Sequence, residues 1–417
     1  MAKKNFLTKK KNAAATAPGV NAYYITVSSR FGFAKWICVA LLALFIAFTV
    51  LFTREEITVN NLRYLLKHFD VNSVDSSSNF DILKYDDNGN YTFGYYKDDL
   101  VVVSSTGVSF YDMHGNAVMN KSHSMSNPAL TATENYLYVY DLGNNAYSVY
   151  NSFACLKSVI TEYPVNMIAA GDTGVFAVVT KDIEYRSKVQ IYDKNFNLLS
   201  EVSKNKLVID VSVSSDGREV LILSCETTTD GEFFTEVSMV RPGKYEPAFT
   251  VEREDSFPIS CTVLSGGGAG VLFSDKFIIY SPSGELVLEY DFTGKTPTTY
   301  ACNGEYTALT FNKSVIGYDS SAIIFDKNGN IVNDITVSGQ CNKSTFENGY
   351  VYVMLTDAVA RLDINSGEVL YEKTESNPID FMVRGGDSLL VCYSDRTVSM
   401  PYSFVPDYLK SETEEEN

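Results

Sequence analysis

The 417-residue sequence predicts an all-β protein, a β-propeller of eight four-stranded blades preceded by one transmembrane helix. Three observations predict this fold. A charge-free apolar run lies near the amino terminus. Short β-branched and aromatic segments, bounded by polar turns, begin near residue 80, and one strand-turn motif recurs about every 40 residues.

The apolar run covers residues 36–52 and reads WICVALLALFIAFTVLF. A helix rises about 1.5 Å per residue, so a helix over 35–53 just covers the hydrocarbon core of a bilayer. A buried core helix is one alternative, but a helix that is apolar on every face has few partners in a strand-rich chain. A cleaved signal peptide would have a shorter run and a small-residue cleavage site. We therefore expect a transmembrane helix at 35–53.

The charges on either side of this run predict its orientation. The charged residues that precede it are all basic, since the first acidic residue in the chain is Glu55. By the positive-inside rule, residues 1–34 form a basic, disordered cytoplasmic tail and the rest of the chain lies outside the cell. The net charge is −17, and without the seven basic residues before the span the outer part carries about −24. Such a surface argues against nucleic acid as a partner and favours solubility or affinity for basic partners.

Two further segments flank the expected propeller. Residues 54–79 hold apolar side chains at helical spacing after Thr58, a candidate N-cap; these are Leu62, Leu65, Leu66 and Phe69. We expect an amphipathic helix here, lying on the outer leaflet or capping the domain, followed by a flexible linker. Residues 406–417 are acidic and predict a disordered tail.

The extracytoplasmic propeller is predicted for residues 80–405 from the repeated motif. In each repeat an apolar strand ends in an aromatic or aliphatic residue, and a tight polar turn leads to a second strand. The residues that close the first of these strands are Tyr111, Tyr150, Tyr192, Val240, Tyr280, Phe325, Leu362 and Met400. Spacings of 37 to 48 residues are typical of four-stranded blades, which bury both faces by stacking in a ring.

The last repeat supplies three strands before the acidic tail begins. We expect residues 80–85, FDILKY, to provide the missing fourth strand. Pairing of this strand with the last blade would close the ring and leave no free blade edge there. Seven blades, or a pair of stacked sheets, are the alternatives.

The sequence offers little material for catalysis. Its three histidines are His68, His114 and His123, so general-base, catalytic-triad and zinc sites have almost no candidates. We therefore propose no catalytic, cofactor-binding or metal-ligating residue, and we expect no cofactor. The tyrosines and phenylalanines at strand positions serve packing, and any at a channel mouth could stack on a sugar or a peptide.

Six cysteines lie outside the apolar run, namely Cys155, Cys225, Cys261, Cys302, Cys341 and Cys392. None has C-x-x-C spacing, and their redox state is left open. Three of them, Cys261, Cys302 and Cys341, take equivalent places in consecutive repeats. They form either a thiol cluster that faces the central channel or, as we favour, small apolar side chains in crowded strands.

Three turns place oxygen side chains on alternate residues, as calcium loops do, at 86–90, 193–197 and 326–330. None has the bidentate acid that closes such a loop, and Asp, Asn and Gly are also what tight hairpins require. We interpret these turns as hairpins. The run from Gly266 to Gly270 has no following helix, so it predicts a loop between strands and not a phosphate site.

The repeats resemble the blades of quinoprotein-like and WD-like propellers. The chain departs from both signatures, because it has no Gly-His to Trp-Asp pair and its only tryptophan is Trp36 in the apolar run. A quinone cofactor is therefore not expected. The order of basic tail, anchor, NLRYLL at 61–66, YKDDLVVV at 96–103 and GVSFY at 107–111 resembles an uncharacterised family of membrane-anchored proteins of Gram-positive bacteria. This resemblance implies a location in the cell envelope.

These observations favour a non-catalytic binding or scaffold module that is anchored in the cell membrane and holds a protein or cell-wall glycan partner. One alternative is an extracytoplasmic hydrolase or lyase that acts on glycans through paired carboxylates at the channel mouth. Another is a sensor that transmits ligand binding through the anchor.

Overall fold

The structure is a computed structural model that describes residues 31–45, 80–85, 90–112, 115–151, 154–312, 319–384 and 388–406. It divides into two units, Met1–Phe69 and Asp70–Asn417. In the first unit, residues 31–45 form a helix whose side chains are exposed. None of the helices described is both long and apolar enough to cross a bilayer, so the predicted membrane span is not confirmed. Residues 46–53 of that span, together with 1–30, 54–79 and 407–417, lie outside the described residues.

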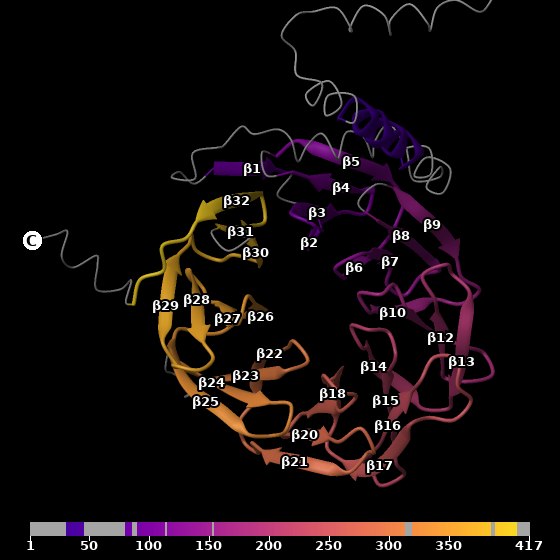
Figure 1. Cartoon of the computed structure of the whole chain (residues 1–417). Helices are drawn as coiled ribbons and strands as arrows, with labels where there is room; N and C mark the ends of the chain where they lie inside the picture. Colours follow the sequence, from indigo (N-terminus) through magenta and orange to yellow (C-terminus); the bar gives the residue numbers. More distant parts are fainter. Residues whose placement is uncertain are drawn as a thin grey trace, which may run out of the picture. The chain divides into compact units, whose positions relative to one another are not determined.

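The second unit contains eight four-stranded antiparallel sheets arranged as the blades of a ring (Figure 1). Blade 1 consists of β2 (Thr92–Tyr96), β3 (Asp99–Val103), β4 (Gly107–Tyr111) and β5 (Ala117–Ser122). Blade 2 consists of β6 (Pro128–Ala132), β7 (Leu137–Asp141), β8 (Ala146–Tyr150) and β9 (Cys155–Ile160). Blade 3 consists of β10 (Val165–Ala170), β11 (Phe176–Thr180), β12 (Ser187–Tyr192) and β13 (Leu198–Lys204). Blade 4 consists of β14 (Leu207–Val213), β15 (Val220–Thr227), β16 (Phe233–Val240) and β17 (Phe249–Asp255).

The remaining blades complete the ring. Blade 5 consists of β18 (Pro258–Val263), β19 (Ala269–Phe273), β20 (Lys276–Tyr280) and β21 (Leu286–Asp291). Blade 6 consists of β22 (Pro297–Cys302), β23 (Tyr306–Asn312), β24 (Asp319–Asp326) and β25 (Ile331–Ser338). Blade 7 consists of β26 (Lys343–Glu347), β27 (Tyr350–Met354), β28 (Ala358–Asp363) and β29 (Val369–Lys373). Blade 8 joins β30 (Asp380–Arg384), β31 (Ser388–Cys392) and β32 (Arg396–Pro401) to β1 (Phe80–Lys84).

The eight-bladed ring confirms the predicted fold class. The closing residues of the repeated motif mark the third strand of each blade, and the strand after the tight turn is the outermost one. Second strands such as β3 and β11 are buried along their whole length, because both of their faces pack against neighbouring blades. The rings of Tyr138 in blade 2 and Phe176 in blade 3, 5.0 Å apart, are part of one such core between blades.

Closure of the ring by the amino-terminal strand is also confirmed. Strand β1 pairs antiparallel with β32, from Phe80 opposite Ser399 to Lys84 opposite Arg396. Tyr85 extends this contact, since its backbone amide donates to the Asp395 carbonyl at 2.9 Å and its hydroxyl donates to a further backbone carbonyl of blade 8. Blade 8 is therefore built from both ends of the propeller, and eight blades replace the alternative of seven.

The turn at 326–330 shows why aspartate and asparagine recur between the third and fourth strands. The Asp326 carboxylate accepts hydrogen bonds from the amides of Asn328, at 2.9 Å, and Asn330, at 2.8 Å, and from the Asn330 side chain. Gly329 supplies the positive φ of 84° that the hairpin requires. Asp193 makes the equivalent contacts in blade 3. The hairpin interpretation therefore holds for these two turns, while residues 86–89 of the third lie outside the described residues.

Candidate binding site on the inner turns of blades 4 to 6

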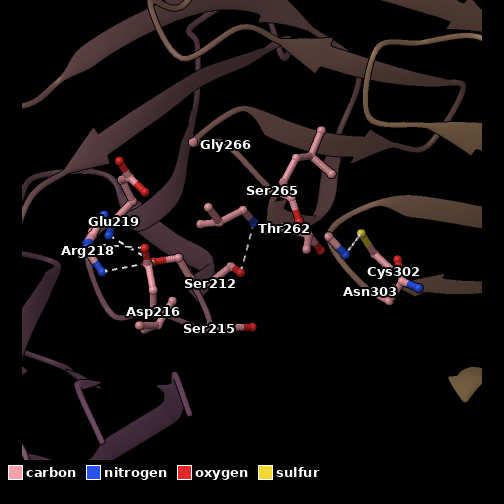
Figure 2. A pocket seen from close by; sticks show the side chains of 16 residues that line it. Ser212, Ser215, Asp216, Arg218, Glu219, Thr262, Ser265, Gly266, Cys302 and Asn303 are labelled. Carbon is pink, nitrogen blue, oxygen red and sulfur yellow. Dashed lines mark hydrogen bonds and ion pairs between the residues drawn. The ribbon is translucent and has the colours of Figure 1, made fainter. Parts of the chain in front are cut away.

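A cavity of about 590 Å³ lies among the turns that join the first and second strands of blades 4, 5 and 6. We call it the inner-turn cavity. It is lined by Ser212, Val213, Ser214, Ser215, Asp216, Arg218, Glu219, Thr262, Val263, Leu264, Ser265, Gly266, Gly267, Cys302, Asn303 and Gly304. Figure 2 shows Asp216, Arg218 and Glu219 on one side, Cys302 and Asn303 on the other, and Ser265 between them. Its lining is mainly hydroxyl, amide and backbone groups.

The cavity is walled by inner turns of unequal length. Blades 1 and 7 join their first two strands by the two residues 97–98 and 348–349. Blade 4 uses the six residues 214–219 and blade 5 the five residues 264–268, so both turns project beyond the strand ends. The three-residue turn 303–305 of blade 6 forms the opposite wall. The cavity therefore lies where the two long turns of blades 4 and 5 meet the short turn of blade 6.

The turn of blade 4 is held by Ser214. Its hydroxyl donates to Asp216 Oδ1 at 2.8 Å and accepts the Glu219 amide at 3.0 Å. The Arg218 amide also donates to Asp216 Oδ1, at 3.1 Å, and Arg218 Nε lies 3.4 Å from Asp216 Oδ2. The Arg218 side chain is 81% exposed, so it remains accessible to a partner. Serine, aspartate and glycine favour such turns because short polar side chains bind nearby backbone amides.

The turns of blades 5 and 6 contact each other across the cavity. The Ser265 amide donates to the Gly304 carbonyl at 2.9 Å. Gly266 and Gly267 have φ values of 94° and 89°, which other residues rarely adopt. A Cβ on Gly267 would lie 3.2 Å from Glu219 Oε1, so the absent side chain allows the backbone to approach this carboxylate. No helix follows the glycine run, as expected, because β19 begins at Ala269.

The surroundings of Asp216 in the cavity stabilise its ionised form. Burial raises the pKa of Asp216, but hydrogen bonds from Ser214 and the Arg218 amide and the charge of Arg218 outweigh this, so its pKa lies below the usual value. Asp216 is therefore ionised at neutral pH. In the part of the chain that the structure describes, no group of three His, Cys, Asp or Glu side chains is placed to hold a metal ion.

Of the residues weighed for chemistry in the sequence, only Cys302 and the start of the glycine run, Gly266 and Gly267, line this cavity. His123 lies beyond the last strand of blade 1, where its Nε2 is 2.8 Å from the Ser104 carbonyl oxygen. His68 and His114 lie outside the described residues. The signal for the cavity was present in the sequence as two polar inner turns, SSDGRE at 214–219, the longest turn between a first and a second strand, and LSGGG at 264–268. It could be found only by comparing equivalent turns of all blades.

The cysteines are distributed through the cores between blades and do not form a cluster in the channel. Cys261 is buried in one core, Cys341 is buried in a second, and Cys302 packs against a third. Cys155, Cys225 and Cys392 are also free thiols. This arrangement supports the interpretation of small side chains in crowded strands, and it corrects the hypothesis of a thiol cluster.

A protein-family model matches residues 70–401, which cover the ring and its closing strand. The chain belongs to the DUF5711 family, a family of unknown function. The matched region begins before β1, so the family region includes the strand that closes blade 8. No curated protein matches the chain.

Several solved structures share the fold of this DUF5711 member. Sqt1 of Saccharomyces cerevisiae has a TM-score of 0.59 at 10% identity, over 79% of this chain and 100% of that one. A eukaryotic initiation factor has a TM-score of 0.53 at 13% identity, over 76% and 87%. The Pan2 WD40 domain of Neurospora crassa has a TM-score of 0.49 at 10% identity, over 79% and 98%. At these identities the first two similarities show the propeller fold alone.

Proposed function

We propose that this DUF5711 protein is a non-catalytic binding module that holds a protein partner at the inner-turn cavity, and that residues 35–53 anchor it in the cell membrane with the propeller outside. The anchoring part rests on the charge-free run 36–52 and on the lysines that precede it. The binding part rests on one observation: the inner turns of blades 4, 5 and 6 wall a polar cavity. Variable loops on a rigid scaffold are where binding residues concentrate.

The rim of the cavity suits a protein loop. Ser215, Arg218, Ser265 and Asn303 are all exposed, so hydrogen-bonding groups project around the opening. An enclosed small-molecule site would instead be mostly apolar with a few polar groups. Among the sixteen lining residues none is aromatic, so the lining offers no stacking surface for a sugar ring. A partner loop with polar side chains and free backbone groups matches this lining.

The alternative of a glycan hydrolase or lyase receives no support from this cavity. Such an enzyme needs one carboxyl group with a raised pKa beside an ionised one. Asp216 has a lowered pKa, and its oxygens are occupied by Ser214 and Arg218. The inner-turn cavity therefore favours binding.

Site-specific photocrosslinking in intact cells tests this function. A photoreactive residue replaces Ser265 in the full-length protein, and a second version carries it at Glu134 in the short inner turn of blade 2 as a matched control. Both positions are exposed. We expect a discrete protein adduct from position 265 and none from position 134, identified by mass spectrometry. Equal labelling at both positions, or recovery of glycan alone from position 265, would contradict the proposed function.

A blocking variant provides the second test. Ser265→Trp fills the mouth of the cavity, and Glu134→Trp adds the same bulk to the control turn. We expect the first to lower recovery of the partner by about tenfold, the effect of losing about 1.4 kcal/mol of binding free energy, and the second to leave it unchanged. Loss of recovery in both variants would show that the cavity is not the contact site.

A further inference from the structure

The chain beyond β32 crosses from blade 8 to the outer edge of blade 7 (Figure 1). We call residues 402–406 the tail segment. Val405 forms an antiparallel bridge with Tyr371 of β29: the Tyr371 amide donates to the Val405 carbonyl at 2.7 Å, and the Val405 amide donates to the Tyr371 carbonyl at 2.8 Å. The tail segment therefore adds a short strand to the edge of blade 7.

A side-chain slot on blade 7 holds the aromatic residue of this segment. Phe404 is only 6% exposed, and its ring lies 6.0 Å from that of Tyr352 and 4.6 Å from that of Tyr402. The Arg361 guanidinium lies 4.7 Å from the ring centroids of both Phe404 and Tyr350. Arginine over an aromatic face attracts it through the ring quadrupole, so the slot selects an aromatic side chain.

Glu372 holds the backbone of the same segment. One oxygen of its carboxylate accepts the amides of Ser403, at 2.8 Å, and Phe404, at 2.9 Å. Hydrogen bonds to an ionised acceptor are stronger than neutral ones. They hold Phe404 at a positive φ of 38°, which non-glycine residues seldom adopt. The slot thus recognises a backbone that turns at a buried aromatic residue and pairs with the sheet edge at the residue that follows it.

We propose that this slot, formed by Tyr352, Arg361, Tyr371 and Glu372, is a second peptide-binding site of the propeller. Its ligand is a segment of a partner protein with the pattern aromatic, any residue, aromatic, aliphatic, and the chain's own Tyr402-Ser403-Phe404-Val405 occupies the site in its absence. Strand addition at a sheet edge, with a pocket for one side chain, is an established mode of peptide recognition. The slot lies on blade 7, so this proposal does not depend on the inner-turn cavity.

The tail segment is suited to displacement. Among the described residues, it pairs with β29 only through the bridge at Tyr371, and its two other bonded amides contact the Glu372 side chain, so it lacks the continuous hydrogen-bond ladder of a full strand. A tethered segment competes at an effective concentration in the millimolar range, which makes occupancy high even when the intrinsic affinity is weak. A partner segment with more strand pairing would displace it.

Peptide binding to the full-length protein tests the proposal. The probe is a fluorescein-labelled peptide with the sequence of residues 400–406, MPYSFVP, and the control peptide has alanine in place of phenylalanine. Fluorescence polarisation compares the wild type with Phe404→Ala, which empties the slot. We expect the variant to bind the probe at least about tenfold more tightly than the wild type does, because the tethered competitor is lost. The variant should not bind the control peptide. Arg361→Ala added to Phe404→Ala should abolish binding of the probe.

A second measurement keeps Phe404 and an aromatic side chain at position 402 in the tail segment. Tyr402→Trp in a Trp36→Phe background places the only tryptophan beside the slot, and we expect its emission to shift to the red when millimolar unlabelled probe displaces the tail. A folded Phe404→Ala variant that binds neither peptide, or both equally, would overturn the proposal, as would an unchanged emission. A wild-type dimer that Phe404→Ala converts to a monomer would also overturn it, since the slot would then exchange tails between copies.

Discussion

The Asp210 carboxylate, on the first strand of blade 4, accepts a 2.6 Å hydrogen bond from the hydroxyl of Ser260, on the first strand of blade 5. The same carboxylate oxygen accepts the Cys261 amide at 2.8 Å. Both strands carry a β-bulge here, between Val208 and Asp210 and between Pro258 and Ser260. A β-bulge changes the direction in which the side chains of a strand point. In this pair of blades, the carboxylate links the two first strands.

This link makes a prediction for pH dependence. Burial raises the pKa of Asp210, and hydrogen bonds from Ser260, Cys261 and Val211 lower it only in part. The stabilisation from a carboxyl group with a raised folded pKa is complete below its unfolded pKa, about 4, and is lost as the pH rises through the folded value. As the pH rises from about 4 to 7, the free energy of unfolding of the wild type should fall relative to that of Asp210→Asn. Urea unfolding at a series of pH values measures this, and a pH-independent difference would contradict it.

Alanine substitutions at two glycines with nearly the same φ distinguish the cost of backbone strain from the cost of disturbed packing between blades. Gly329, at 84°, faces blade 5, and an added Cβ would lie 2.9 Å from Leu288 Cβ. Gly294, at 85°, has open space around it. Gly294→Ala should cost roughly 1–2 kcal/mol from backbone strain alone. Gly329→Ala should cost a further 1 kcal/mol or more, roughly, because blades 5 and 6 must separate. Equal losses in urea unfolding would show that this contact does not constrain the turn.

The closing strand gives a graded prediction at Tyr85. Its hydroxyl donates to the Tyr393 carbonyl at 2.8 Å, and its ring lies 4.7 Å from that of Tyr91 and 5.7 Å from that of Phe93. Tyr85→Phe should lower the free energy of unfolding by about 1 kcal/mol, the value of one hydrogen bond. Tyr85→Ala should lower it by about 2–3 kcal/mol because the ring contacts are also lost.

A tyrosine outside the core is the control for this series. Tyr245→Ala removes a fully exposed ring and should change the free energy of unfolding by less than about 0.5 kcal/mol. Thermal or urea unfolding of the three variants measures their order of stability. If Tyr85→Ala is no more destabilising than Tyr245→Ala, the closing strand does not contribute to the stability of the ring.

The cysteines are expected to differ in reactivity. Burial raises the pKa of the thiols of Cys225, Cys261, Cys302, Cys341 and Cys392. Since the thiolate is the reactive form, iodoacetamide at pH about 8 should label the partly exposed Cys155 first among these six, Cys302 at the cavity more slowly, and the four buried thiols only after unfolding in urea. Peptide mass spectrometry measures the extent of labelling at each cysteine. Labelling of Cys261 or Cys392 in the native protein at the rate of Cys155 would contradict the buried placement.

Several features of the ring were predictable because they are local in the sequence. Alternating apolar residues and turn residues specify a strand and its hairpin within a dozen positions, as at Asp326 to Asn330. The repeat of this pattern gave the number of blades, and an unpaired strand at 80–85 predicted the closure of blade 8. The turns at 193–197 and 326–330 were distinguished from calcium loops by the missing closing acid and by the residues that tight hairpins require.

The candidate sites were less predictable because they join residues that are distant in the sequence. Glu219 and Gly267 meet at the inner-turn cavity from different blades, and Arg361 and Phe404 meet across blades 7 and 8. The distribution of Cys261, Cys302 and Cys341 among three cores likewise depends on how neighbouring blades face each other. Period-two patterns identify which residues are apolar and do not say which blade face each one contacts.

By itself, the sequence determined the strand content, the eight repeats and the use of an amino-terminal strand to complete the last one, because hydrophobic alternation and turn chemistry act over a few residues. Only the tertiary structure decided where the ring departs from its repeat. Those departures are the long turns around the inner-turn cavity, the bulged strands linked by Asp210 and the tail segment on blade 7. They arise when blades about 40 residues apart pack side by side, and no local pattern encodes that contact.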